Sequence, residues 1–326
     1  MNKLLKPHED QLKKTDFPGW ISPTLAKLTD DHFSDPNWIY ERKLDGVRCL
    51  IFKKGNKVQL FSRNKKLQNN IYPEICEAFT NQNQDFVADG EIVTFVDGIS
   101  SFSKLQGRIN RSDPSDALIR DIPVYFYLFD LMYLDGYSTE GIPLRIRKSI
   151  LKNAIDFEDP LRYCQHKNEK GIQFYEDACK KGWEGLIAKD ATSNYINGRS
   201  SKWLKFKCVN QQELVLGGFT EPEGDRKGFG AILVGYFEEK TLHYAGKVGT
   251  GWSDDELVEL REKFEKKQRK TSPFDEELDE DGVHYLTPYF VAEIGFTEWT
   301  DDNKLRHPRY IGMRYDKDAS EVIKEQ

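Results

Sequence analysis

The octapeptide Glu41-Arg42-Lys43-Leu44-Asp45-Gly46-Val47-Arg48 places a lysine between two acids, inside sequence that is otherwise strand-like. The flanking segments 38–40 and 47–52 are rich in β-branched and aromatic residues. We therefore predict a strand, a tight turn at Gly46 and a second strand. Side chains alternate along a strand, which puts Glu41, Lys43 and Asp45 on one face. Alone, such a triplet is typical of a surface ladder of ion pairs, and it indicates a reactive lysine only if the rest of the chain supplies partners.

The chain has 326 residues, enough for two domains, and its content of 38% hydrophobic and 13% aromatic residues is typical of a globular protein. Its formal net charge of −6 argues against a nonspecific nucleic-acid coat protein. The segment 42–66 differs, because it holds nine Lys and Arg residues and the single acid Asp45. We therefore expect a basic face despite the acidic total.

The five cysteines are scattered, so we expect neither a disulfide framework nor a zinc site, and a reducing compartment. No apolar run approaches the length of about eighteen residues that a membrane helix needs. The N-terminus carries acids and no apolar run, so we expect no signal peptide. These features predict a soluble cytoplasmic protein that makes no membrane contact, associated with the nucleoid if its source is bacterial.

The predicted fold class is α+β, with a change of character near residue 210. Residues 1–210 mix strand patterns with helices expected at 72–79, 145–155 and 170–181. Residues 211–326 contain short strands with Gly-rich joints and one helix, which opens with a capping box at Ser253. This second pattern predicts a small β-barrel of the oligonucleotide-binding type, the OB-fold.

Five further motifs each have an ordinary structural explanation when taken alone. Acids at 89 and 91 share a strand face, an arrangement that also suits glycoside hydrolysis, but no second separated pair accompanies them. The others are typical of a strand end, a buried aromatic strand, a helix-to-strand turn and a half-buried strand. In chain order the five are Phe61-Ser62-Arg63-Asn64, Asp89-Gly90-Glu91, Phe126-Tyr127-Leu128-Phe129-Asp130-Leu131, Glu184-Gly185-Leu186-Ile187-Ala188-Lys189 and Trp203-Leu204-Lys205-Phe206-Lys207.

The order and spacing of these motifs resemble the covalent nucleotidyltransferases, which include DNA ligases, RNA ligases and mRNA capping enzymes. The Lys-x-Asp-Gly-x-Arg pattern at 43–48 resembles their adenylylated-lysine motif, and Arg-x-Asp-Lys within 305–317 resembles their last motif. The segment 246–252 further resembles the ligase domain of bacterial end-joining DNA ligases. The resemblance spans 41–317 and implies an ATP-dependent DNA ligase, with an adenylation domain at 1–210 and an OB-fold domain at 211–326.

The resemblance also implies roles for single residues. Lys43 would carry AMP, while Lys205 and Lys207 would clamp the α-phosphate. A lysine at its ordinary pKa of about 10.4 is protonated at neutral pH and cannot attack phosphorus, so the two neighbouring cations would also help to deprotonate it. The implied nucleotide-binding residues are Glu41 at the adenine amino group, Asp45, Arg48, Glu91 at the ribose hydroxyls, Phe129 stacked on adenine, and Arg306, Arg314 and Lys317 at the triphosphate.

The remaining implied partners are a metal ion and DNA. Glu184, together with Asp45, would hold the divalent cation, Mg²⁺ or Mn²⁺. Arg63, which the resemblance also counts among the nucleotide-binding residues, would lie beside the nucleophile and grip a phosphate of the nicked strand. On charge and position alone, Lys104 and Arg108 are candidates for contacts with the DNA backbone.

The resemblance departs from larger relatives, because we find no N-terminal DNA-clamping domain and no polymerase or nuclease module. We therefore expect a monomer that works with a DNA-end-binding or other repair protein. An NAD-dependent ligase is disfavoured, since its extra N-terminal region and four-cysteine zinc module are missing. Two alternatives stay open at this point: an RNA ligase or mRNA-capping guanylyltransferase, and a noncatalytic nucleic-acid-binding module.

Overall fold

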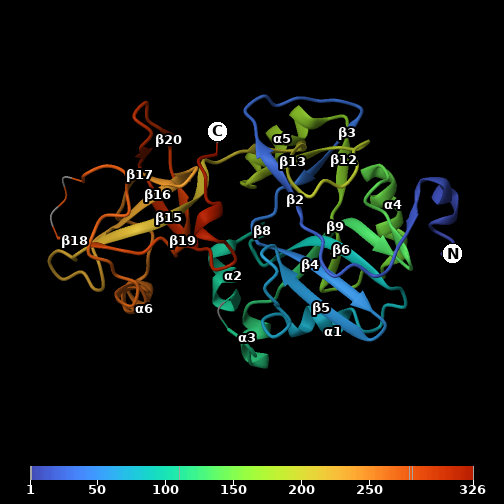
Figure 1. Ribbon diagram of the computed structural model, residues 1–326, viewed down its shortest axis with the longest axis horizontal. Helices are drawn as coiled ribbons and strands as arrows, with labels where there is room; N and C mark the ends of the chain where they lie inside the picture. Colours follow the sequence, from blue (N-terminus) through green and yellow to red (C-terminus); the bar gives the residue numbers. More distant parts are fainter. Residues whose placement is uncertain (1, 110, 279, 281, 326) are drawn as a thin grey trace. The chain divides into compact units, whose positions relative to one another are not determined.

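The computed structural model describes residues 2–109, 111–278, 280 and 282–325. The chain divides into two compact units, Met1–Cys208 and Val209–Gln326, which we call unit 1 and unit 2 (Figure 1). Both units combine β-sheets with a few helices, so the predicted α+β class is confirmed. Within the described part of the chain, no helix is long and apolar enough to cross a membrane.

The first sheet of unit 1 has seven strands and is antiparallel except where its short β11 pairs with β9. Six strands follow the order β1 (Lys13–Lys14), β10 (Tyr137–Ser138), β9 (Tyr125–Leu134), β6 (Phe86–Val93), β4 (Val47–Lys54) and β5 (Lys57–Ser62), and β11 spans Leu161–Tyr163. Most side chains of β4, β6 and β9 are buried, because these central strands are covered on both faces.

The second sheet of unit 1 carries the first half of the Lys43 motif. Its order is β12 (His166–Asn168), β3 (Trp38–Arg42), β13 (Gly185–Asp190), β14 (Gly198–Lys207) and β2 (Thr24–Leu28). The predicted strands on either side of Gly46 therefore exist, but they belong to different sheets. Gly46 lies where the chain crosses between them, and a Cβ atom there would come within 2.1 Å of the Ile92 carbonyl oxygen.

Unit 1 has helices at the three sequence ranges predicted for it, and it has three further short helices. The helices of unit 1 are η1 (Lys6–Gln11), α1 (Pro73–Ala78), α2 (Phe102–Ile109), α3 (Asp116–Asp121), α4 (Leu144–Ala154) and α5 (Gly171–Lys180), and a small hairpin joins β7 (Phe95–Val96) to β8 (Ile99–Ser100). The buried face of α4 includes two basic residues, Arg147 and Lys148, beside Leu144 and Leu151. This spacing of i, i+3, i+4 and i+7 is the periodicity of a core-facing helix.

A disulfide joins Cys179 to Cys208, with their Cα atoms 5.2 Å apart. The expectation that the cysteines form no disulfide was therefore wrong. The pairing arises from the fold, because α5 ends just before β13 and the start of β13 pairs with the end of β14. Among the described residues, the remaining cysteines, Cys49, Cys76 and Cys164, form no disulfide.

Unit 2 is built on a six-stranded antiparallel sheet. Its strands follow the order β17 (Thr241–Val248), β16 (Ile232–Glu238), β15 (Gln211–Thr220), β19 (Val291–Gly295) and β22 (Arg309–Met313), with β18 (Val283–Tyr285) paired to β15. A separate pair joins β20 (Glu298–Trp299) to β21 (Leu305–Arg306), and η2 (Ala319–Glu321) lies near the C-terminus.

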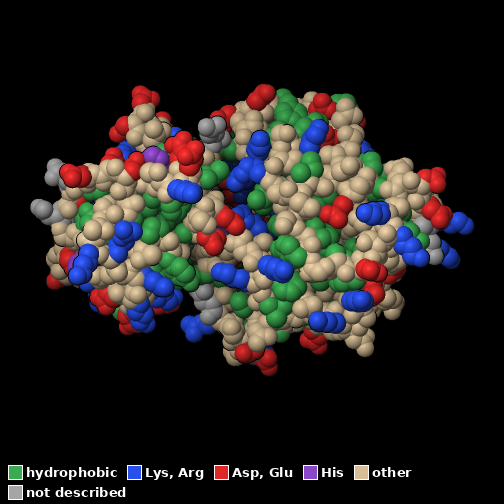
Figure 2. Space-filling model, in the orientation of Figure 1, with side chains coloured by type: hydrophobic (Ala, Val, Ile, Leu, Met, Phe, Trp, Pro, Cys, Tyr) green, Lys and Arg blue, Asp and Glu red, His purple; other side chains and the backbone are tan. Residues whose placement is uncertain are grey.

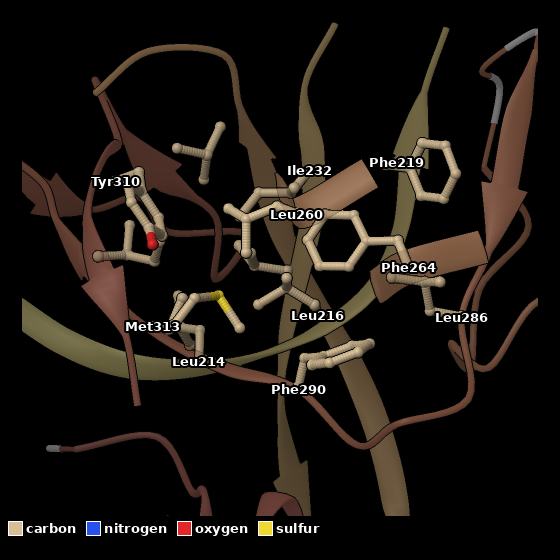
Figure 3. Packing of buried hydrophobic residues seen from close by; sticks show 14 of the residues in the cluster. Leu214, Leu216, Phe219, Ile232, Leu260, Phe264, Leu286, Phe290, Tyr310 and Met313 are labelled. Atoms are coloured by element: carbon tan, nitrogen blue, oxygen red, sulfur yellow. The ribbon is translucent and has the colours of Figure 1, made fainter. Parts of the chain in front are cut away.

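One hydrophobic cluster of unit 2 packs this sheet against α6 (Asp254–Glu265), and a second contains no residue of α6. Phe264 and Leu260 of α6 point toward Leu216 of β15 and toward Phe290, which directly precedes β19 (Figure 3). The predicted capping box is present, because the Ser253 hydroxyl accepts from the Glu256 N–H and the Glu256 carboxylate accepts from the Ser253 N–H. Reciprocal capping fixes where α6 begins.

Candidate active site

Lys43 lies one residue beyond β3, where its N–H donates to the Gly185 carbonyl oxygen at 2.9 Å. Its ammonium forms an ion pair with the carboxylate of Glu184, which lies between α5 and β13. The two side chains are 17% and 7% exposed. The structure therefore brings together the predicted nucleophile and the predicted metal ligand from positions 141 residues apart in sequence.

The strand register aligns the predicted lysines with the Lys43 motif. Ile187 of β13 pairs with Glu41 on one side and with Lys205 on the other. Paired residues in neighbouring strands present their side chains on the same face of the sheet. Lys207 pairs with Gly185, the residue whose carbonyl holds Lys43, so both lysines of β14 share the face of Lys43.

Gly185 leaves the space between Lys43 and Lys207 without a side chain. Its φ of +142° and the 1.9 Å approach of a built Cβ atom to the Phe206 carbonyl oxygen exclude other residues. This explains why a glycine directly follows the acid of the Glu-Gly-x-x-x-Lys motif.

Glu41 lies in a buried cluster of charge, which we call the Glu41 cluster and which consists of Glu41, Lys148 and Lys189. The carboxylate is 2% exposed, with Oε1 2.5 Å from Lys148 Nζ and Oε2 2.6 Å from Lys189 Nζ. Burial acts to raise the pKa of Glu41, but the two ammonium groups outweigh burial and lower it. Burial lowers the pKa of Lys189, whereas the attraction of Glu41 overcomes burial at Lys148 and raises its pKa.

The Phe129 ring lies next to this cluster and is 7% exposed. Lys189 Nζ is 4.0 Å from the ring centroid, and the Arg48 guanidinium carbon is 4.5 Å from it. Trp203 meets the ring edge-on, with centroids 5.9 Å apart. The predicted stacking residue therefore lies between cations and an aromatic wall, and stacking of adenine upon it stays a prediction.

Arg48 is bound to a buried acid for which the sequence suggested no role. Its guanidinium donates two hydrogen bonds to Asp89, at 2.5 and 2.7 Å, and Asp89 also accepts from the Tyr195 hydroxyl at 2.5 Å. Burial acts to lower the pKa of Arg48, and the attraction of Asp89 outweighs it and raises that pKa. Glu91 lies directly across from Arg48 in the ladder between β4 and β6 and is partly buried.

Of the two carboxylates that the sequence assigns to a metal ion, Glu184 fits this role better than Asp45. The Oε2 atom of Glu184 is buried and has no hydrogen-bond partner among the described residues. Asp45 is partly occupied, because it accepts from the Phe102 N–H at 3.3 Å. Within residues 2–109, 111–278, 280 and 282–325, no group of three or more His, Cys, Asp or Glu side chains could hold a metal ion. Mg²⁺ commonly binds through one or two carboxylates plus substrate phosphates, so Glu184 is compatible with it.

One prediction about DNA was wrong. Arg108 is fully buried, and its guanidinium donates to the carbonyl oxygens of Ile71 at 2.8 Å and Ile122 at 3.0 Å while pairing with Glu74 at 2.8 Å. A guanidinium held inside the protein cannot contact a DNA backbone. Lys104 and Arg63 are partly buried, and Arg63 follows β5 with its N–H donating to the Arg48 carbonyl oxygen at 3.1 Å.

The last motif lies in unit 2 and contributes to a second, largely buried cluster of charge, which we call the Arg314 cluster. Its members are Glu213, Glu293, Arg314, Asp316 and Lys317. The Arg314 guanidinium donates to both carboxylate oxygens of Asp316 at 3.0 Å and lies 3.2 Å from Glu293. Lys317 Nζ lies 2.8 Å from Glu213. Burial alone would raise the pKa of Asp316, but Arg314 outweighs burial and lowers it.

Arg306 differs from Arg314, because its side chain is 58% exposed and pairs with the exposed Glu298 at 2.6 Å. Action of Arg306, Arg314 and Lys317 on a triphosphate stays a prediction.

Sequence reasoning missed two residues of the site, Lys148 and Asp89. Lys148 carried a detectable signal, because it occupies a core-facing position of the helix predicted at 145–155, where a lysine requires a buried partner. Asp89 carried a weaker signal, the pairing of two acids on one strand face. The partner of each residue follows only from the fold.

The chain matches two protein families. The ATP dependent DNA ligase domain matches residues 23–207, and the ATP dependent DNA ligase C terminal region matches residues 225–317. The multifunctional non-homologous end joining DNA repair protein LigD of Mycobacterium tuberculosis is 37% identical over 98% of this chain and 42% of its own length. The Pseudomonas aeruginosa protein LigD is 33% identical over 96% of this chain and 38% of its own length. The chain thus spans about two fifths of these relatives.

Solved structures give the same result. A structure of mycobacterial DNA ligase D complexed with ATP and MES is 34% identical, with a TM-score of 0.66 over 94% of this chain and 98% of that chain. The ligase domain of M. tuberculosis LigD is 35% identical, with a TM-score of 0.50 over the same shares. The resemblance inferred from the motifs, and the fold of an adenylation domain followed by an OB-fold domain, are confirmed. The ATP dependent DNA ligase domain matches more than half of the 326 residues of this chain, and the chain therefore belongs to the ATP-dependent DNA ligase family.

Proposed function

We propose that this protein seals nicks in duplex DNA during repair, using ATP and an AMP group carried first by Lys43 and then by the 5′-phosphate of the nick. The observation that carries the proposal is the pairing of Lys43 with Glu184, on the sheet face that also bears Lys205 and Lys207. Such a lysine in a chain of the ATP-dependent ligase family has the surroundings that phosphoryl transfer requires.

Three transfers make up the reaction. The amine of Lys43 attacks the α-phosphorus of ATP, a P–N bond forms, and the P–O bond to pyrophosphate breaks. The 5′-phosphate of the nick then displaces Lys43 from AMP, and the 3′-hydroxyl finally displaces AMP to form the phosphodiester bond. Positioning and cationic groups supply most of the rate in such reactions, which is the role proposed for Lys205 and Lys207.

Glu184 is the proposed ligand of Mg²⁺ or Mn²⁺, with Asp45 as a second candidate. A divalent cation would supply positive charge to the phosphate oxygens of the nucleotide. The buried and unpaired Oε2 atom of Glu184 supports this role. Because the same carboxylate pairs with Lys43, a cation bound there would compete with the Lys43 ammonium.

The Glu41 cluster supports ATP over GTP as the nucleotide. Glu41 offers an acceptor and Lys189 a donor, with the two atoms 2.6 Å apart. The edge of adenine offers the complementary pair, a donor at its 6-amino group and an acceptor at N1. Guanine presents the reverse, an acceptor at O6 and a donor at N1. The cluster therefore favours a ligase over a capping guanylyltransferase.

DNA binding is proposed to depend mainly on phosphate contacts of unit 1, in a monomer that works with a DNA-end-binding or other repair protein. The nine basic residues of segment 42–66 support the first part of this proposal. The name of the LigD relatives, which refers to non-homologous end joining, supports the second part.

The test uses purified protein, labelled ATP and a nicked duplex. We expect a covalent adduct with ATP, none with GTP or NAD, and sealing of the nick; Lys43→Ala should lose the adduct and all sealing from ATP. An adduct of unchanged yield in Lys43→Ala would refute the assignment of the nucleophile. Sealing of nicked RNA alone would favour an RNA ligase, and the absence of any adduct would favour a noncatalytic binding module.

A further inference from the structure

Lys148 is a charged side chain that reaches the interior from α4 and is 1% exposed. Its ammonium lies near three oxygen atoms, Glu41 Oε1 at 2.5 Å, the Cys164 carbonyl at 3.1 Å and the Phe129 carbonyl at 3.4 Å. An ammonium has three donors, so these three acceptors satisfy it completely. A buried lysine with every donor used has a single stable position.

The two ammonium groups of the Glu41 cluster approach the carboxylate from different parts of the fold. Lys189 belongs to β13, the strand paired with the β3 strand that carries Glu41. Lys148 belongs to a helix, and it contacts the other oxygen atom of the carboxylate. A carboxylate held through both oxygens from two directions cannot rotate about its last bond. Lys148 therefore fixes the orientation of Glu41 that Lys189 alone would leave free.

Lys148 also connects the two residues that are predicted to contact the adenine base. Glu41 is the proposed reader of the adenine edge, and Phe129 is the proposed platform for the adenine face. One ammonium bonds the side chain of the first and the backbone of the second. The distance between edge reader and platform thus depends on Lys148.

We propose that Lys148 is a positioning residue that holds the Glu41 carboxylate in register with Phe129, and thereby sets the preference for bases that carry a 6-amino group. The inference rests on the proposed function, because the role of Lys148 requires that Glu41 and Phe129 bind the nucleotide of that reaction. Lys148 acts through Glu41 and Phe129, so its effect should fall on recognition of the base and not on transfer of the AMP group.

The test compares adenylylation of Lys43 by ATP with adenylylation by purine riboside triphosphate, which lacks the 6-amino group. We expect Lys148→Met, a neutral side chain of similar length, to reduce the ratio of the two kcat/KM values about 10- to 100-fold, the value of one charge-assisted hydrogen bond. The loss should appear mainly as a higher KM for ATP. Lys152→Met, on the exposed face of the same helix, is the matched control and should leave the ratio unchanged.

Two further measurements separate positioning from general damage. Sealing of a nick that already carries 5′-linked AMP needs no free nucleotide, so Lys148→Met should perform it at nearly the wild-type rate. Lys148→Met leaves Glu41 and Lys189 as a buried pair of equal and opposite charge, and if it yields little folded protein the comparison is made with Lys148→Arg. Lys148→Arg keeps the charge with a different donor geometry, and its ratio should lie between those of wild type and Lys148→Met.

The outcomes distinguish the inference from the function on which it rests. Equal losses with both nucleotides in Lys148→Met or Lys148→Arg, with the ratio unchanged, would show that Lys148 only stabilises the fold and would overturn the inference. Failure of the wild-type protein to form any adduct with ATP would overturn the proposed function itself.

Discussion

The Glu41 cluster of unit 1 is buried and the Arg314 cluster of unit 2 is largely buried, but their excess charge has opposite sign. The Glu41 cluster sets one carboxylate against two ammonium groups. The Arg314 cluster sets the three carboxylates of Glu213, Glu293 and Asp316 against one guanidinium and one ammonium. Buried charge is costly unless it is paired, so the excess charge of each cluster adds to the cost of burying it.

The same contrast holds for the whole units. Unit 1 has 32 Lys and Arg residues against 28 Asp and Glu residues, whereas unit 2 has 16 against 26. On the face shown in Figure 2, both units carry basic and acidic side chains. Attraction of nucleic acid phosphates should therefore come mainly from unit 1.

Breaking the Arg314 cluster should have the largest effect on stability. Arg314→Ala would leave buried carboxylates without their guanidinium, and removing one partner of a buried pair typically costs about 3 to 5 kcal/mol. Chemical denaturation followed by tryptophan fluorescence should detect this loss. Arg306→Ala, which removes an exposed pair, is the control and should change stability by less than about 1 kcal/mol. Unchanged stability of Arg314→Ala, with loss of adduct formation only, would instead support a direct role at the triphosphate.

Removing the excess positive charge near Lys43 should have an intermediate effect. Lys205→Ala and Lys207→Ala should each slow formation of the Lys43 adduct about 10- to 100-fold, measured without DNA, because one phosphate contact is lost. The pH optimum of this step should also move upward, since nearby cations favour the uncharged amine. The same substitution at Lys202, an exposed residue of the same strand, should change neither value. A normal rate and an unshifted pH profile would show that both lysines only line a strand face.

The smallest predicted effect concerns His166, which pairs with Glu41 across β12 and β3. Burial, and then the positive charge of Lys148, lower the pKa of His166 from 6.5 to about 4. A histidine with a depressed pKa stays neutral when folded, so the folded state is fully stable above pH 6.5 and loses stability as the pH falls toward 4. Between pH 7 and pH 5 we expect a loss of about 1 kcal/mol after allowance for solvent screening, which His166→Asn should abolish. Urea denaturation at the two pH values measures it, and an equal loss in His166→Asn would exclude this histidine as the source.

The sequence predicted those parts of the site that depend on local geometry. Lys205 and Lys207 share a face because side chains alternate along one strand. Gly46 is different, because the contact that excludes a side chain there comes from Ile92 of β6. The sequence did not predict which strands pair with one another across distant segments. The strands on either side of Gly46 were expected to be neighbours, yet β3 and β4 lie in different sheets.

The wrong prediction for Arg108 and the missed role of Lys148 have one physical cause. A basic residue on a helix is predicted to be exposed unless its buried hydrogen-bond acceptors are known. In both cases these acceptors come from other segments of the chain, as backbone carbonyls or acidic side chains. Tertiary packing therefore decides which of the charged residues face solvent and which hold the site together.

The disulfide between Cys179 and Cys208 determines how this protein behaves when its backbone is cut. The bond closes a covalent ring that contains all of β13 and β14, and with them Glu184, Lys205 and Lys207. A protease that cuts once inside this ring leaves two fragments still joined, and they separate on a gel only after reduction. A single cut just beyond Cys208 instead removes every covalent link between the ring and unit 2. Limited proteolysis with and without a reducing agent would therefore locate a cut relative to the ring.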